Sequence, residues 1–456
     1  MGEKAATNEV INRLISALGD SDRSVRWSAC EALGKMGEKA ATNEVINRLS
    51  SALGDSDRSV RSGACEALGK MGEKAATSEV INRLISALGD SDRRVRSRAC
   101  EALGKMGEKA ATNEVINRLI SALGDSDRSV RWSACTTLDK VGEKAATSEV
   151  INRLISALGD SDRSVRSGAC EALGKMGEKA ATSEVINRLS SALGDSDPSV
   201  RSDACGALGK MGEKAATSEV INRLIGALGD SDRSVRSGAC VVLGKMGEKA
   251  ATSEVINRLS SALGDSDKSV RWSASEALGK MGEKATTSEV INRLISALGD
   301  SDDSVRWRAC TTLGEMGEKA ATNEVINRLS SALGDSDESV RWSACRTLGQ
   351  MDEKAATSEV VNRLISALGD TDRWVRSGAC EALGKMGEKA ATSEVINRLI
   401  SALGDTGRWV RSGACQALGK MGEKAVTSEV INRLSSALGD SDVYVAKTAH
   451  KAIDTL

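Results

Sequence analysis

Apolar residues near the start of the chain recur at the spacing of one buried helical face, which predicts an amphipathic helix over residues 8–18. Thr7 or Asn8 is suited to cap the start of this helix, and Gly19 is suited to the left-handed residue beyond its end. The predicted buried face consists of Val10, Ile11, Leu14, Ala17 and Leu18.

A second amphipathic segment follows an acidic turn and predicts a helix over residues 23–36. Asp22 is the expected N-cap and Gly37 the expected stop. In a later copy of the segment, Pro198 falls at the first helical position, where helices accept proline because the missing N–H has no helical partner anyway. The predicted buried face consists of Val25, Ala29, Ala32, Leu33 and Met36.

This pair of helices repeats with a period of 35 residues. Thirteen copies (1–35, 36–70 and so on to 421–455) leave only Leu456 outside the repeat. A two-helix unit in tandem predicts an all-α fold, an α-solenoid that forms a single domain over residues 1–456. Positions in the repeat are numbered below by the residues of the first copy.

The stretch "RLISALGDSDRSVRWSACEALGKMG" (residues 13–37) resembles HEAT repeats, most closely the short type found in phycobilisome lyases. The resemblance covers every copy and implies a right-handed superhelix whose second helices line the concave surface. It also implies a ladder between neighbouring copies that uses Asp20 and Arg26. The "EKAAT" connector is longer than in that short type, so we expect an extra helical turn, as in armadillo units.

The copies differ mainly at positions 23, 24, 27, 28 and 31, almost opposite the buried face of the second helix. Every aromatic residue lies on this variable stripe, at position 24 or 27. Exposed Trp and Arg are frequent interface anchors, so we predict a binding surface for a protein or peptide. Neutral drift of an exposed surface is the alternative. The candidate binding residues are Trp27, Trp132, Trp272, Trp307, Trp342, Trp374, Trp409, Tyr444, Arg94, Arg98, Arg308 and Arg346.

The charge balance weighs against nucleic acid as the main partner. The chain has 63 basic and 64 acidic residues, and Asp303 and Glu338 lie on the variable stripe itself. Nucleic-acid binding through Arg and Trp is therefore the second hypothesis, and chromophore handling, by family analogy alone, the third. No apolar run is long enough for a membrane span and the start lacks signal-peptide features, so we expect a cytoplasmic protein without a membrane partner.

No residue pattern predicts an enzyme or a cofactor. The eleven cysteines all fall at position 30 without CxxC spacing, which indicates small half-buried thiols rather than disulfides or zinc ligands. His450 is the only histidine and has no catalytic companions. The Asn12-type residues form either a hydrogen-bonded ladder or a solvated surface. Position 15 alternates between Ile and Ser, and we expect the Ile residues to add packing.

The two ends of the repeat array differ in sequence. The last copy, residues 421–456, departs most from the others and is expected to act as a C-terminal cap. The first copy does not depart, so we expect its apolar side to be exposed, either because the chain is a fragment or because it associates end to end through this repeat. Scattered changes such as Asp139, Val141 and Asp352 favour a natural amplified array over consensus design.

Overall fold

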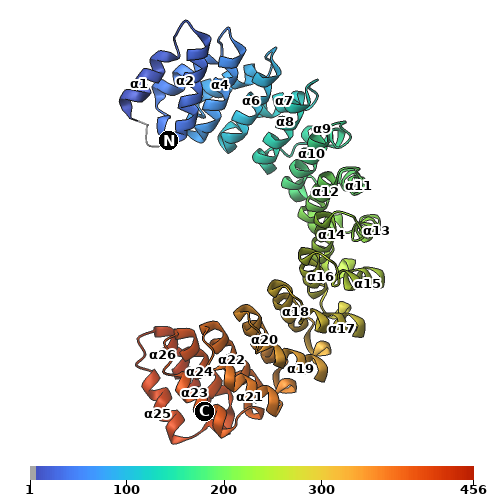
Figure 1. Cartoon of the computed structure of the whole chain (residues 1–456), viewed down its shortest axis with the longest axis vertical. Helices are drawn as coiled ribbons and strands as arrows, with labels where there is room; N and C mark the ends of the chain where they lie inside the picture. Colours follow the sequence, from blue (N-terminus) through green and yellow to red (C-terminus); the bar gives the residue numbers. More distant parts are fainter. Residues whose placement is uncertain (1–6) are drawn as a thin grey trace. The chain divides into compact units, whose positions relative to one another are not determined.

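A computed structural model describes residues 7–456 of the chain, and all regular secondary structure in them is helical. Each 35-residue copy forms two α-helices, and a short 3-10 helix links most copies (Figure 1). The all-α prediction and the pairing of helices within the repeat are confirmed. The 3-10 helices lie in the connectors, where the sequence predicts an extra turn.

The first helices of the copies span ten residues each. They are α1 (Asn8–Ala17), α3 (Asn43–Ala52), α5 (Ser78–Ala87), α7 (Asn113–Ala122), α9 (Ser148–Ala157), α11 (Ser183–Ala192), α13 (Ser218–Ala227), α15 (Ser253–Ala262), α17 (Ser288–Ala297), α19 (Asn323–Ala332), α21 (Ser358–Ala367), α23 (Ser393–Ala402) and α25 (Ser428–Ala437).

The second helices are slightly longer. They are α2 (Arg23–Met36), α4 (Arg58–Lys70), α6 (Arg93–Lys105), α8 (Arg128–Val141), α10 (Arg163–Lys175), α12 (Pro198–Met211), α14 (Arg233–Met246), α16 (Lys268–Lys280), α18 (Asp303–Glu315), α20 (Glu338–Gln350), α22 (Arg373–Met386), α24 (Arg408–Lys420) and α26 (Val443–Thr455).

The connectors form 3-10 helices. They are η2 (Gly37–Ala40), η3 (Gly72–Ala75), η4 (Gly107–Ala110), η5 (Gly142–Ala145), η6 (Gly177–Lys179), η7 (Gly212–Ala215), η8 (Gly247–Ala250), η9 (Gly282–Ala285), η10 (Gly317–Ala320), η11 (Asp352–Ala355), η12 (Gly387–Lys389) and η13 (Gly422–Ala425).

By its internal contacts the chain divides into two units, Met1–Arg223 and Leu224–Leu456. Within each unit the second helices pack directly against one another, and the first helices form a looser second row. Within each unit, the row of second helices lies on the inner side of the curve (Figure 1). A single solenoid domain over residues 1–456 and the right-handed superhelix both stay predictions.

Local capping follows the sequence with one correction. The Thr7 hydroxyl accepts a hydrogen bond from the Val10 N–H and caps α1, and Asp22 caps α2 through the Ser24 N–H. The first helix of the repeat, however, ends without a left-handed glycine, because Gly19 does not have a positive φ. The positive φ occurs instead at the end of the second helix, where Gly37 has φ 57° and ψ −137°, which only glycine adopts readily.

The second helices approach closely because glycine recurs at position 34. A Cβ added to Gly244 in α14 would lie 2.8 Å from the Cα of Ala277 in α16. The same glycine-to-alanine contact recurs between other neighbours, as for Gly69 and Ala102. Small residues at positions 34 and 32 therefore set the distance between neighbouring repeats.

An arginine–aspartate ladder runs along the acidic turns. The Arg26 side chain donates from Nε and Nη2 to the two carboxylate oxygens of Asp55 in the next repeat, at 2.7 and 2.9 Å. Its Nη1 also donates to the backbone oxygens of Asp20 and Ser21 in its own repeat. Both charged side chains are only 14% exposed. The ladder implied by the HEAT resemblance is confirmed, and the aspartate of each pair belongs to the following copy.

We predict that Gly244→Ala destabilises the protein by about 2 kcal/mol, because the added methyl group meets backbone atoms of α16 and forces the helices apart. Gly206→Ala is the matched control, since a Cβ there has nothing within 4 Å and alanine favours the helix. Urea unfolding followed by circular dichroism measures both. Equal midpoints for the two variants would contradict the role assigned to position 34.

We also predict that the stability falls as the pH drops below about 4. Hydrogen bonding by the Arg26 guanidinium holds the pKa of Asp55 below its ordinary value, and Arg236 does the same for Asp265. Folding lowers the pKa of these carboxyl groups, so each ionised carboxylate stabilises the folded state at a pH above its pKa in the unfolded chain. This stabilisation is lost as the pH falls through the pKa of the folded state and the carboxylate becomes protonated. Asp300→Asn removes the carboxylate from one arginine–aspartate pair of this ladder. It should lower the urea midpoint at pH 7, and the difference in midpoint between the variant and the unmodified chain should shrink at acidic pH.

Candidate interaction surface on the second helices

The aromatic residues are distributed unequally between the two units. In residues 7–223, Trp27 lies on α2 and Trp132 on α8. In residues 224–456, six consecutive second helices, α16 to α26, each carry one aromatic side chain. These are Trp272, Trp307 and Trp342 at position 27, followed by Trp374, Trp409 and Tyr444 at position 24.

Exposure separates the aromatic residues into two groups. Trp27, Trp132, Trp374, Trp409 and Tyr444 are exposed, from 39% for Trp409 to 55% for Tyr444. Trp272, Trp307 and Trp342 are half-buried. The predicted solvent-facing stripe therefore exists, but its central tryptophans also take part in packing.

Tryptophan at position 27 packs against position 28 of the following repeat. The Trp27 Cδ1 atom lies 3.2 Å from the position that a Cβ atom on Gly63 would take. The Trp342 Cδ1 atom lies at the same distance from the corresponding position on Gly378. Tryptophan at position 27 therefore contributes to the packing between repeats as well as to the surface. Each indole covers the contact between its own second helix and the second helix of the following repeat, and its outer part stays in solvent.

Serine at position 27 makes a different contact with the same neighbour. The Ser97 hydroxyl lies 2.9 Å from that of Ser133, and Ser237 pairs with Ser273 at the same distance. Ser167 is hydrogen-bonded to Asp203. Positions 27 and 28 of neighbouring copies therefore contact each other, and the pairs include an indole on a glycine, an indole beneath Arg308 and two hydroxyl groups.

Arginines flank several of the indoles. The Arg373 guanidinium lies 5.1 Å from the Trp374 ring centroid, and Arg408 lies 4.9 Å from that of Trp409. Trp409 also meets Tyr444 edge to face, with ring centroids 5.4 Å apart. Cation–π and aromatic contacts of this kind hold the side chains in place before any ligand arrives.

Arg308 is a correction to the predicted site. It is only 8% exposed, so it is not a surface charge. Its guanidinium lies over Trp272 at 5.9 Å and donates to Glu315 at 3.0 Å, and its Nε has no hydrogen-bond partner among the described residues. Burial raises the pKa of Glu315, against the opposing effect of Arg308. This pair acts within the packing of α16 and α18.

The other candidate arginines lie at the surface or near it. Arg94 is exposed and borders a groove of about 590 Å³ that also reaches Trp27, Arg23 and Arg58. Arg98 is half-buried between Glu66 and Glu101, at 3.6 and 2.8 Å. Arg346 is exposed and stacks over Trp342 at 5.6 Å.

Two further ladders of ion pairs connect neighbouring copies. Basic residues at position 23 pair with the aspartate at position 22 of the next copy, as Arg93 does with Asp127 at 2.8 Å. Lysines at position 4 pair with the glutamate at position 3 of the preceding copy, as Lys144 does with Glu108 at 2.7 Å. Neither ladder was expected from the sequence, although the regular 34- and 36-residue separation of opposite charges signals them.

The position-23 ladder is interrupted in the aromatic-rich unit. Asp303 and Glu338 replace the basic residue at the start of α18 and α20. Farther along, Gly407 replaces the aspartate that Arg373 would meet, and the Arg373 side chain stacks on Trp374 instead. These changes alter the charge beside the aromatic row without touching the position-26 ladder.

The cysteines are buried more deeply than predicted. All eleven are free, and those from Cys30 to Cys415 are 0% exposed rather than half-buried. The reason is that position 30 faces the next second helix, where the Cβ of Cys30 lies 3.2 Å from the Cβ site of Gly63. Burial raises the pKa of the Cys30 thiol to about 12.

The remaining polar candidates were His450 and the Asn12-type residues. No group of three or more His, Cys, Asp or Glu side chains there is placed to hold a metal ion. His450 is exposed and its Nδ1 lies 2.9 Å from the Asp454 carboxylate. The Asn12 side chain is exposed, which favours the solvated alternative, and its backbone oxygen accepts from Ser16. Within the same residues, no helix has the length and apolar character that a bilayer span requires.

We predict that the cysteines stay unreactive toward a thiol reagent until the repeats separate, because burial keeps them protonated and inaccessible. Lys451→Cys provides an exposed control thiol on α26. Ellman's reagent should modify the control thiol quickly and the native thiols at least about 100-fold more slowly. Rapid modification of several native thiols would contradict the burial of position 30.

The paired helices, the ladder at the acidic turns and the glycine-mediated contacts define a helical-repeat protein. HEAT repeats match the chain in overlapping segments: 11–81, 46–119, 81–151, 116–186, 151–223, 186–259, 221–293, 256–332, 291–360, 326–395 and 361–454. The chain therefore belongs to the HEAT-repeat family. No curated protein sequence is significantly similar to it.

Solved structures with a similar fold include Kap95p, in work on its binding to RanGDP, with 14% identity and a TM-score of 0.59. The match covers 98% of this chain and 66% of that one. A chain of the Kap95:Nup1 complex matches at 13% identity with a TM-score of 0.59 over 98% of this chain and 67% of its own. Importin β matches at 14% identity with a TM-score of 0.55 over 98% and 77%. At these identities the likeness concerns the fold.

Proposed function

We propose that the protein is a non-enzymatic scaffold that binds a protein or peptide on the aromatic stripe of its second helices. The observation that carries the proposal is the row of one aromatic residue on each of the six helices α16 to α26. A binding surface needs large side chains that are already ordered but still reachable. Trp374, Trp409 and Tyr444 have this character, since each is at least 39% exposed.

The charges beside the row favour a polypeptide over a nucleic acid. Asp303 and Glu338 lie beside the earlier part of the row and Arg346, Arg373 and Arg408 beside the later part, so the surface offers both signs. The position-26 arginines do not add a free positive field, because each described pair is bidentate, as between Arg341 and Asp370. Phosphate binding would require arginines without carboxylate partners.

The similar folds support a scaffold in the same way. Kap95p is described as binding RanGDP and Kap95 as forming a complex with Nup1, so related stacks of helices do bind proteins. Free cysteines at position 30 are compatible with a reducing compartment, and we propose a cytoplasmic location. Self-association through the first repeat also stays a prediction.

Trp374→Ser combined with Trp409→Ser is the direct test, because position 24 carries serine in most copies and the fold tolerates it. A peptide selected from a displayed library against the full chain serves as the probe. We expect the double variant to bind this peptide more weakly by about 2 kcal/mol, roughly 30-fold, in calorimetry. The helix content and the melting temperature should stay close to those of the unmodified chain.

Trp27→Ser combined with Trp132→Ser is the matched control, since it removes the same number of indoles from the other unit. Equal weakening by both double variants, or by neither, would refute the assignment of the ligand to the row on α16 to α26. A labelled single-stranded oligonucleotide tests the alternative partner. Tight binding that weakens steeply with added salt would favour a nucleic acid instead.

A further inference from the structure

Five consecutive second helices of the first unit, α2, α4, α6, α8 and α10, begin with an arginine at position 23. Each guanidinium donates from Nη1 to the aspartate at position 22 of the following repeat, over distances from 2.8 Å for Arg93 to 3.3 Å for Arg58. We call this series the arginine row. Its members are Arg23, Arg58, Arg93, Arg128 and Arg163.

The arginine row presents positive charge to solvent, whereas its carboxylate partners lie beneath it. The Arg163 side chain is 72% exposed and that of its partner Asp197 only 12%. The second oxygen of each aspartate is engaged as well, since Asp127 Oδ1 accepts from the Ser129 N–H at the helix cap. Each pair uses one arginine nitrogen, so the N–H donors on Nε and Nη2 are left for a ligand.

The first repeat is no more open at position 23 than the internal repeats. The Arg23 side chain is 73% exposed and that of Arg128 in α8 is 74% exposed. Their partners Asp57 and Asp162 are equally covered, at 15% each. The exposure of the row therefore arises from the contact of each repeat with the next one, and four of its five members belong to internal repeats.

Arg94 adds a cation beside the arginine row. The other copies carry serine or an aromatic residue at position 24. The backbone N–H of Arg94 donates to Asp92, but its exposed side chain has neither an ion pair nor a hydrogen bond within the described residues. It borders the groove of about 590 Å³ on α2, α4 and α6, which Arg23 and Arg58 also line. The groove thus combines three guanidinium groups, one of them without a carboxylate partner.

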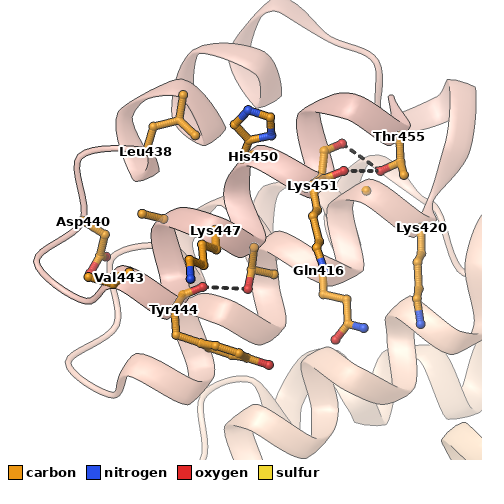
Figure 2. Close-up of a pocket in the computed structure, with 14 residues that line it drawn as sticks. Gln416, Lys420, Leu438, Asp440, Val443, Tyr444, Lys447, His450, Lys451 and Thr455 are labelled. Atoms are coloured by element: carbon orange, nitrogen blue, oxygen red, sulfur yellow. Dashed lines mark hydrogen bonds between the residues drawn. The ribbon is translucent and has the colours of Figure 1, made fainter.

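The second unit has no continuous arginine row at position 23. Asp303 and Glu338 bring negative charge to the start of α18 and α20. Val443 stands at the start of α26, at the edge of the hollow that Figure 2 shows. Arg233 and Lys268 keep the contact with the next repeat, at 3.1 and 2.9 Å, but they are only two in succession. A long basic row is therefore a property of the first unit.

The spacing of the row matches one conformation of an acidic segment. Packed helices lie about 8–10 Å apart, so successive arginines recur at about that distance. A polyproline II segment rises about 3.1 Å per residue with three residues per turn, so carboxylates at every third residue lie about 9 Å apart on one face. In a β-strand, residues three apart point to opposite faces. In an α-helix, residues seven apart would fit the distance but drift by about 20° at each step.

The aspartates beneath the row favour a ligand whose charges are widely spaced. Each row arginine already has one carboxylate partner, so only Arg94 adds uncompensated charge. A nucleic-acid strand with a phosphate on every nucleotide would need a stronger positive field. A peptide with one carboxylate per repeat needs only the outer N–H donors of one guanidinium at a time. The surface therefore fits an acidic polypeptide better than a nucleic acid.

We propose that the arginine row and Arg94 form a binding site for an extended acidic segment of a protein, with Asp or Glu at every third residue of a polyproline II conformation. Each row arginine donates to one carboxylate of the segment. Arg94 fixes the register, because it is the cation that departs from the 35-residue period. The site uses other helices than the aromatic row on α16 to α26 and does not depend on the proposed function.

The probe is a fluorescein-labelled peptide of five Glu-Pro-Pro units, in which the prolines hold the polyproline II conformation and place every Glu on one face. Fluorescence anisotropy with the full chain measures its affinity. A peptide of the same composition with its five Glu residues in succession should bind at least about fivefold more weakly. Absence of binding of the spaced peptide up to about 1 mM chain, or equal or tighter binding of the contiguous peptide, would overturn the proposal.

Arg93→Glu combined with Arg128→Glu reverses two members of the row and should weaken binding of the spaced peptide at least about tenfold. Acidic residues are accepted at this position, as Asp303 and Glu338 show. Arg233→Glu combined with Lys268→Glu is the matched control, because it makes the same reversal at the same position of the second unit. Its affinity should stay within about twofold of the unmodified chain. Equal weakening by the two double variants would overturn the assignment to the row.

Arg94→Ser is a second variant, which restores the serine of most copies and leaves the ladder intact. It should weaken binding about threefold, and an unchanged affinity would remove Arg94 from the site. Circular dichroism checks that each variant folds. Trp374→Ser with Trp409→Ser should leave the affinity for the spaced peptide unchanged, which separates this site from the proposed function. Tighter binding of a labelled strand of about fifteen thymidines than of the peptide would overturn the proposal in favour of a nucleic acid.

Discussion

The bidentate arginine–aspartate contact between successive repeats is the interaction on which the rest of the structure depends. A two-helix unit of 35 residues cannot bury its apolar faces alone, so its stability comes from its neighbours. The contact between Arg26 and Asp55 joins the acidic turns of two repeats and also binds backbone oxygens of its own turn. Its geometry aligns the second helices so that Gly34 meets Ala67 and the thiol of Cys30 is fully buried.

This alignment also explains why only part of each second helix is free to vary. Positions 29 and 33 are enclosed, and in most copies the glycine at position 34 lies directly against the next helix. Position 27 lies at the outer edge of the contact. It accepts a serine or a tryptophan, as at Ser97 beside Ser133 and Trp27 against Gly63. Variation at this edge therefore changes the surface while the distance between repeats is kept.

The aromatic row is a consequence of this variation at the edge of the contact between repeats. It arises where neighbouring copies carry large side chains there, so that the exposed parts follow one another along α16 to α26.

The sequence by itself determined the period, the two helices of each copy, the cap Asp22 and the apolar face of each helix, and it left the first cap open between Thr7 and Asn8. These features depend on residue spacing and on local hydrogen bonds, which are the same in every copy. The sequence also placed the aromatics on one variable stripe. It misplaced Gly19, because the choice between a right-handed turn and a left-handed residue depends on how the acidic turn packs.

Only the tertiary structure decided which variable residues stay in solvent. Arg308 and Trp272 occupy positions that look exposed on an isolated helix, yet Arg308 is 8% exposed and Trp272 is half-buried. The Arg308 guanidinium lies over Trp272 of the neighbouring helix and 3.0 Å from Glu315 of its own helix. The pairing of positions 27 and 28 and the burial of Cys30 likewise arise between copies. Helical periodicity describes one helix at a time, whereas burial at a helix edge depends on the distance and angle of the next helix, which the contact of Gly34 with Ala67 sets.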